Sequence, residues 1–122
     1  MAAPNIVNVT SIFGKTLGAA LGVTATTDLL TCASDKVLKV NTIIISNVDG
    51  TVAADATVYF YDSSAAARYA LAYLITVPAG SSLVIVGKDN PIYLEESDQI
   101  EGGASAASDL QIIISYEEID DA

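Results

Sequence analysis

The residues with the greatest capacity for chemistry in this chain are its carboxylates and one thiol. Acidic residues are adjacent at Glu95-Glu96, Glu117-Glu118 and Asp120-Asp121, and Cys32 is the only cysteine. Two carboxylates that converge on one substrate can carry acid–base catalysis. Neighbouring residues of a strand point to opposite faces, however, so acids adjacent in the sequence do not converge. We interpret these pairs as charges that keep strand ends soluble.

Histidine is absent from the chain. The commonest general base is therefore missing, and Ser-His and Cys-His nucleophile pairs are excluded. Zinc sites draw on several Cys and His ligands, so a lone cysteine does not predict one. Cys32 follows the apolar pair Leu29-Leu30, which favours a small buried residue over a reactive thiol. We expect no enzymatic activity, no catalytic residue and no cofactor.

Two further binding motifs have partial matches in the sequence. Gly14-Lys15-Thr16 has the ending of a phosphate-binding loop, but that motif needs a glycine at the position of Val9. Asp49, Asp55 and Asp62 lie around one predicted hairpin, and calcium takes oxygen ligands from loops. Their spacing does not match an EF-hand loop. A calcium site is therefore an open alternative, and no residue is assigned as a metal ligand.

The charge balance excludes two classes of partner. Fifteen acidic residues stand against five basic ones, which gives a net charge of −10. Nucleic-acid binding needs clustered basic groups, and an anionic membrane surface would repel this chain. No apolar run approaches the ~20 residues that span a bilayer. Hydrophobic residues make up 52% of the sequence, so we expect a partner to cover part of the apolar surface.

Strands are the elements predicted to position these residues. Val, Ile, Tyr and Leu alternate or cluster in short runs, as half-buried and buried strands require. The runs are residues 6–10, 37–46, 57–61, 69–77, 83–86 and 110–116, and Ile92, Leu94 and then Ile100 continue the pattern before the last of them. Asp49-Gly50, Pro78-Ala79-Gly80, Asp89-Asn90-Pro91, Ser97-Asp98 and Gly102-Gly103 are read as the turns between them. Residues 17–25 fit a loop, a hairpin or a short helix, and residues 63–70 a loop leading into a strand.

This pattern predicts an all-β fold, an antiparallel β-sandwich. We expect one domain over residues 1–122, with an N-terminal arm at about 1–9 and a short acidic C-terminal tail at about 117–122. The isoleucine runs at 43–45 and 112–114 suggest strands with two dry faces, one facing the core and the other a subunit interface. The candidate interface residues are Ile6, Val7 and Val9 of the arm and Tyr69, Tyr73 and Ile75 of the strand at 69–77.

Residues 4–16, 36–62 and 77–119 resemble small virion structural proteins of tailed phages, notably contractile-tailed phages of marine cyanobacteria. A recurrent feature of that resemblance is Leu94-x-x-x-Asp98-x-Ile100, followed by small residues and a final strand at 110–116. The resemblance covers most of the chain and includes no catalytic signature. It implies a jelly-roll-like sandwich that decorates or joins parts of the particle.

The sequence therefore favours a non-enzymatic virion protein, a capsid decoration or cement protein assembled in the host cytoplasm. Its expected partners are the phage major capsid protein or another virion protein, together with copies of itself, with a trimer favoured. The alternative is a tail, neck or fibre component that binds a receptor or glycan through tyrosines. A small hydrolase is the third class, and it would need convergent carboxylates in a cleft.

Overall fold

The structure, a computed structural model, describes residues 11–120. Within that range the chain forms nine strands and no helix: β1 (Ser11–Ala20), β2 (Asp28–Thr31), β3 (Lys36–Asn47), β4 (Ala54–Asp62), β5 (Ala67–Val77), β6 (Ser82–Val86), β7 (Ile92–Leu94), β8 (Gln99–Ala104) and β9 (Leu110–Asp120). The all-β prediction is confirmed. The predicted strand at residues 6–10 lies outside the described residues.

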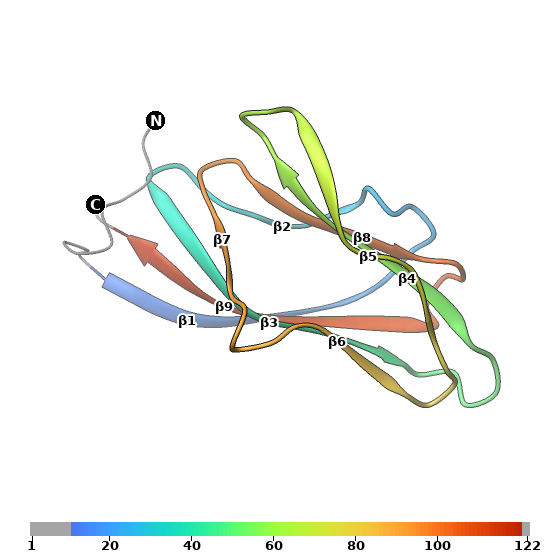
Figure 1. Ribbon diagram of the computed structural model, residues 1–122. Coiled ribbons are helices and arrows are strands. Elements are labelled where there is room, and N and C mark those ends of the chain that lie inside the picture. The colour runs from blue at the N-terminus through green and yellow to red at the C-terminus, as the bar shows by residue number, and fades with distance from the viewer. Residues whose placement is uncertain (1–10, 121–122) are drawn as a thin grey trace.

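The strands form two antiparallel sheets that pack face to face (Figure 1). Sheet A has the order β1-β9-β3-β6, and the short β7 also pairs with β3. Sheet B has the order β2-β8-β4-β5. Without β7, eight strands remain, four in each sheet. Their order, β1-β9-β3-β6 in sheet A and β2-β8-β4-β5 in sheet B, is that of an eight-stranded jelly roll. The predicted jelly-roll-like sandwich is therefore confirmed.

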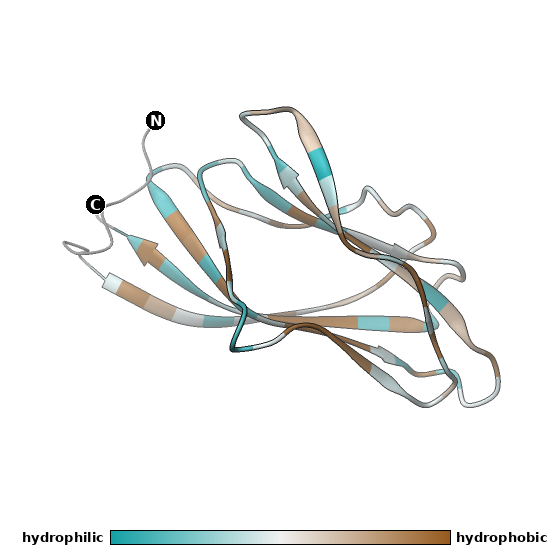
Figure 2. Ribbon diagram, viewed as in Figure 1, coloured by the Kyte–Doolittle hydropathy of each residue, from teal (hydrophilic) through white to brown (hydrophobic). Residues whose placement is uncertain are grey.

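The core lies between the sheets and follows from alternation along the strands. On β9, Leu110, Ile112 and Ile114 are fully buried, whereas Gln111 and Ile113 between them are exposed. Figure 2 shows the hydrophobic residues gathered along β6 and β9 of sheet A. Burying an isoleucine side chain stabilises the fold by about 1.5–3 kcal/mol. The core of one chain therefore covers only one face of the isoleucine runs, because Ile113 points away from it.

Two segments of sheet A, residues 17–20 and 117–120, differ from the predictions. Residues 17–20 belong to β1, which pairs along its whole length with β9 from Ser11 opposite Asp120 to Ala20 opposite Gln111. Residues 117–120, predicted as part of a solvated tail, are instead the end of β9. That segment pairs with β3 on one side and β1 on the other, so its backbone hydrogen bonds are used in the sheet.

Gly102-Gly103, predicted as a turn, lies inside β8. The segment from Gly22 to Thr27 runs against this strand, and Ala104 N donates to Gly22 O over 2.8 Å. A Cβ atom on Gly103 would lie 2.7 Å from the carbonyl carbon of Thr24. Glycine is therefore required here by the close approach of two backbones rather than by a turn.

Candidate assembly surface

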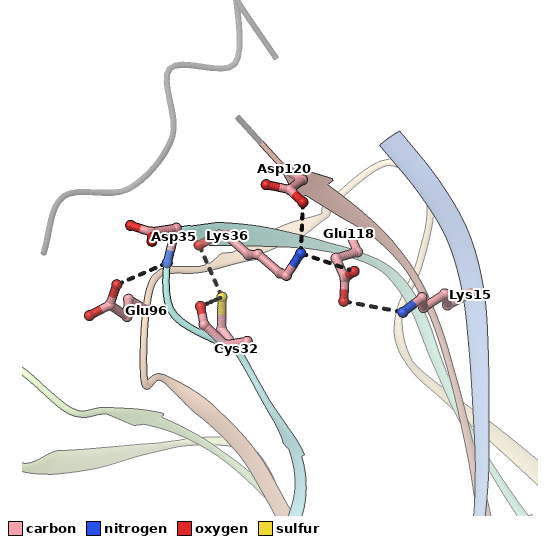
Figure 3. Close-up of polar contacts among 8 residues, drawn as sticks. Lys15, Cys32, Asp35, Lys36, Glu96, Glu118 and Asp120 are labelled. Atoms are coloured by element: carbon pink, nitrogen blue, oxygen red, sulfur yellow. Dashed lines mark hydrogen bonds and ion pairs between the residues drawn. The ribbon is translucent and has the colours of Figure 1, made fainter. Parts of the chain in front are cut away.

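Four charged side chains at one end of sheet A form a ladder across three strands (Figure 3). Lys15 Nζ of β1 donates to Glu118 Oε2 of β9 over 3.2 Å. Lys36 Nζ of β3 lies 3.6 Å from Glu118 Oε1 and 2.9 Å from Asp120 Oδ2. The hydrogen bond that Lys36 donates to Asp120 is the main cause that raises the pKa of Lys36. These carboxylates join strands to one another through the lysines.

Two more of these acids, Glu96 and Glu117, have hydrogen-bond partners of their own. Glu96 Oε2 accepts the backbone N–H of Asp35 over 3.0 Å. Glu117 Oε2 accepts from Asn41 Nδ2 over 3.3 Å, while its neighbour Glu118 binds the lysines. Among residues 11–120, no group of three or more Cys, Asp or Glu side chains is placed to hold a metal ion.

Three aspartates named as possible calcium ligands do not converge. Asp49 Oδ1 accepts the backbone N–H and the hydroxyl of Thr51, and these bonds lower the pKa of Asp49. Asp62 Oδ1 accepts the N–H and hydroxyl of Ser64, and Asp55 Oδ1 accepts the hydroxyl of Thr76. Asp49 precedes β4, whereas Asp62 is the last of the nine residues of that strand, which is about 27 Å long when extended. Each of these carboxylates stabilises its own turn or strand pair.

Asp98 is the centre of the Leu94-x-x-x-Asp98-x-Ile100 pattern, and its side chain joins two turns. Its side chain is buried, with 5% of the residue exposed. Asp98 Oδ1 accepts the backbone N–H of Ser63 over 3.0 Å, and Oδ2 accepts that of Glu95 over 3.1 Å. Leu94 and Ile100 on either side are fully buried. The pattern therefore connects the β4–β5 turn to the β7–β8 turn, which is a role in the fold.

Cys32 lies just after β2, beside this junction, and only 2% of it is exposed. Its thiol donates to Lys36 O over 3.2 Å, as Figure 3 shows. Its backbone N–H donates to Asp98 O over 3.0 Å. Burial raises the pKa of the thiol to about 11, so the thiol stays protonated at neutral pH. The prediction that Cys32 is a small buried residue is confirmed.

Several large apolar side chains on β5, an edge strand of sheet B, are exposed to solvent. The exposed fractions are 57% for Tyr69, 60% for Tyr73, 56% for Leu74 and 42% for Ile75. We call these four residues the β5 surface. Three of them are consecutive, which a regular strand would not place together on the outside. Contiguous exposed apolar residues mark interaction sites more often than single ones do.

An irregular backbone produces this exposure. Ala56 pairs with Ile75 and Val58 with Ala72, so Thr57 faces the two residues Tyr73 and Leu74. Such a β-bulge bends an edge strand and re-aims its side chains. Leu74 has a φ of 51°, a left-handed conformation that is rare for a bulky residue. The buried Thr57 hydroxyl accepts the Leu74 N–H over 3.2 Å and holds the bulge.

An ion pair borders the β5 surface on the same strand. Arg68 Nε donates to Glu101 Oε1 over 2.8 Å, and the guanidinium lies 5.2 Å from the centre of the Tyr61 ring. The bulge breaks the regular row of N–H and C=O groups that strand addition needs. The β5 surface is therefore suited to docking through side chains against a shaped partner rather than to extending the sheet.

The predicted interface residues fall into two groups. Tyr69, Tyr73 and Ile75 lie together on β5 and are exposed; Ile6, Val7 and Val9 lie outside the described residues. Sequence reasoning missed Leu74, because alternation placed it on the face opposite to Tyr73 and Ile75. The sequence carries no signal for its positive φ.

A shallow depression of about 370 Å³ lies between β1 and β9, lined by Gly18, Ala19, Ala20, Gln111, Ile112 and Ile113. None of these side chains ionises near neutral pH, so the depression offers no acid or base. Over residues 11–120, the chain contains no helix that is long and apolar enough to cross a membrane. Comparison of the chain with protein-family models, with curated proteins and with solved structures found no match.

Proposed function

We propose that the chain is a non-enzymatic structural component of a phage virion that decorates or cements the capsid by packing against other virion proteins. The observation that carries this proposal is the β5 surface. It presents Tyr69, Tyr73, Leu74 and Ile75 to solvent on one edge strand. Aromatic and aliphatic anchors of this kind dominate the binding energy of protein interfaces.

Backbone strain at Leu74 supports a binding role for the same surface. A bulky residue held at positive φ costs about 1–3 kcal/mol, and such strain persists mainly where function requires it. Here the strain accompanies a bulge that puts Tyr73 and Leu74 together opposite Thr57, and both side chains are exposed. A surface that served only solubility would gain nothing from this arrangement.

The rest of the described chain suits a rigid component of an assembly. Within residues 11–120, every buried side-chain nitrogen and oxygen has a hydrogen-bond partner. Its carboxylates join strands and turns, as the Lys15–Glu118–Lys36 ladder and Asp98 illustrate. On a particle, many identical copies with modest individual affinity would be held by avidity.

The test is mass spectrometry and immunogold labelling of purified particles of the phage whose genome encodes the chain. We expect many copies per particle, with the label over the head. Absence of the chain from purified particles would overturn the proposal. Label confined to the tail or neck would overturn capsid decoration and favour the alternative function below.

The alternative function is glycan binding by a tail, neck or fibre component. Its specific support is the exposure of Tyr69 and Tyr73 on one strand, since tyrosine rings can stack on sugars. A glycan array distinguishes the two functions. Binding that disappears in a Tyr69→Ala, Tyr73→Ala double variant would favour glycan recognition over decoration.

A further inference from the structure

The outer face of sheet A carries a regular pattern of uncharged residues across β1, β9, β3 and β6. One apolar row runs from β1 to β6 and consists of Gly18, Ile113, Ile44 and Val84, each paired with the next. A row on one side consists of Ala20, Gln111, Ser46 and Ser82, and a row on the other of Thr16, Ser115 and Thr42. Val84 is 60% exposed and Ile113 is 46% exposed. We call these eleven positions the neutral face.

No residue of the neutral face is charged, although the chain carries a net charge of −10. A typical protein surface is about 25–35% charged, so about three charges would be expected among eleven positions. Charges return farther along the same face, where Lys39 pairs with Glu117. A basic partner would be attracted to other parts of this acidic chain. A second copy, by contrast, is repelled least at a surface without charge.

The apolar row has its smallest residue at one end and a protruding residue at the other. Two copies of the row in opposite directions are therefore complementary in shape. Gly18 has no side chain, and it lines the depression between β1 and β9. Val84 protrudes at the other end of the row. A two-fold axis parallel to the strands would place Val84 of one copy over Gly18 of the other, and Ile113 over Ile44. The flanking rows are small and flat, as sheet-on-sheet packing at about 10 Å requires.

We propose that the neutral face pairs with the neutral face of a second copy of this chain, related by a two-fold axis parallel to the strands. The contact is isologous and therefore closes as a dimer, in place of the trimer favoured from the sequence. It does not depend on the virion assignment, because it requires no other protein. It also leaves the β5 surface, on the other sheet, free for a different partner.

The area of the face sets the strength of this pairing. Each position occupies about 33 Å² of sheet, given ~4.8 Å between strands and ~6.8 Å between residues on one face. The eleven positions cover about 360 Å², below the ~800 Å² per partner of a stable complex. A contact of this size belongs with weak, transient interfaces, so we expect the dimer to exchange with monomer.

Sedimentation velocity of the purified full-length chain over a wide concentration range tests the proposal. We expect the wild-type chain to shift from monomer to dimer as concentration rises. Gly18→Lys should remain monomeric, since it buries a charge in the contact. Gly14→Lys is the matched control, because it adds the same side chain to the same face of β1 beyond the neutral face. A Cβ at either glycine meets no atom within 4 Å.

A charge-swap variant tests the axis. Val84→Glu alone should also be monomeric, whereas the Gly18→Lys, Val84→Glu double variant should regain the dimer through two Lys–Glu pairs between copies. Three strand spacings separate the two positions within one copy, too far for an internal pair. Circular dichroism melts confirm that each variant is folded.

Three results would overturn the proposal: a wild-type chain that stays monomeric at every concentration, a dimer that Gly18→Lys leaves intact, or a dimer that Gly14→Lys breaks equally. A double variant that stays monomeric would overturn the proposed axis. None of these results involves phage particles, so a failure here is distinct from a failure of the proposed function.

Discussion

The β5 surface and the neutral face expose apolar residues in opposite ways. The neutral face lies on regularly paired strands, and its side chains follow from simple alternation. The β5 surface depends on a bulge and a strained leucine, and an Arg68–Glu101 ion pair borders it. A flat, regular face is complementary to itself, whereas an irregular surface is complementary to a particular shape. We infer that the first joins copies of the chain and that the second binds a different protein.

The largest expected effect is a loss of stability in the fold that both surfaces share. Asp98→Ala deletes the acceptor of the Ser63 and Glu95 N–H groups, and we expect a loss of about 3 kcal/mol in the free energy of unfolding. Urea denaturation measures it. Asp89→Ala, in an exposed turn, is the control and should change stability by no more than about 0.5 kcal/mol. Equal stabilities of the two variants would contradict the role assigned to Asp98.

The next effect separates the two surfaces. Tyr73→Asp places a charge in the β5 surface, and we expect it to weaken binding to phage heads by about 2 kcal/mol, close to 30-fold. Self-association should not change. Titration of labelled protein onto heads that lack the native copy measures this. Tyr93→Asp, on the exposed tyrosine of β7, is the matched control; an equal loss in both variants would argue against the β5 surface as the docking site.

The dependence of stability on pH tests the burial of the Cys32 thiol. The Cys32 thiol has an ordinary pKa of 9.0, which burial raises to about 11 in the folded chain. Between these values the unfolded chain has lost the proton and the folded chain keeps it. The stabilisation is therefore complete below pH 9 and falls as pH rises toward 11.

At pH 10 we expect this loss to reach about 1 kcal/mol relative to pH 8. Urea denaturation of the wild-type chain and of Cys32→Ala at both pH values measures it. All other residues are the same in both proteins, so the difference between them isolates the thiol. The same pH dependence in the two proteins would show that Cys32 does not contribute.

A gain in stability would distinguish the strained surface from the regular one. Leu74→Gly relieves a positive φ of 51°, and we expect the free energy of unfolding to rise by about 0.5–1 kcal/mol while head binding weakens. Leu71→Gly is the control on the same strand. Leu71 packs against the core, so its loss should destabilise the chain. A destabilised Leu74→Gly variant would mean that the bulge carries no strain.

The smallest effect concerns the neutral face. Because both copies carry −10, salt should screen their repulsion, and we expect dimerisation to strengthen severalfold between about 0.01 M and 0.1 M salt, as the Debye length falls from ~30 to ~10 Å. Sedimentation at several salt concentrations measures this. Dimerisation that weakens with salt would indicate a contact made of ion pairs.

The central strands could be predicted because their pattern is local. The runs at 37–46 and 110–116 lie within β3 and β9, where alternating isoleucines face the core. β1 could not be predicted, since Gly14, Gly18 and Ala20 have low strand propensity. This edge strand forms because β9 supplies a partner along its whole length.

The candidate sites were predictable only in part. Alternation picked out Tyr69, Tyr73 and Ile75, and all three are exposed on β5. The bulge depends on how β4 and β5 align, and no local pattern encodes that alignment, so Leu74 was missed. The neutral face depends on the register of four strands, so the row from Gly18 to Val84 is visible only once these strands are paired.

The pairing of Ser11 with Asp120 has a mechanical consequence. β1 and β9 are antiparallel neighbours, so both ends of the described chain leave the sandwich at one corner. Tension between these two points would act across the strands, along the inter-strand hydrogen bonds, and would break them one pair at a time. This direction of pulling is the weakest for a sheet, because shearing would load all the pairs together. A component that bears load should therefore transmit force through its broad faces and not through these ends.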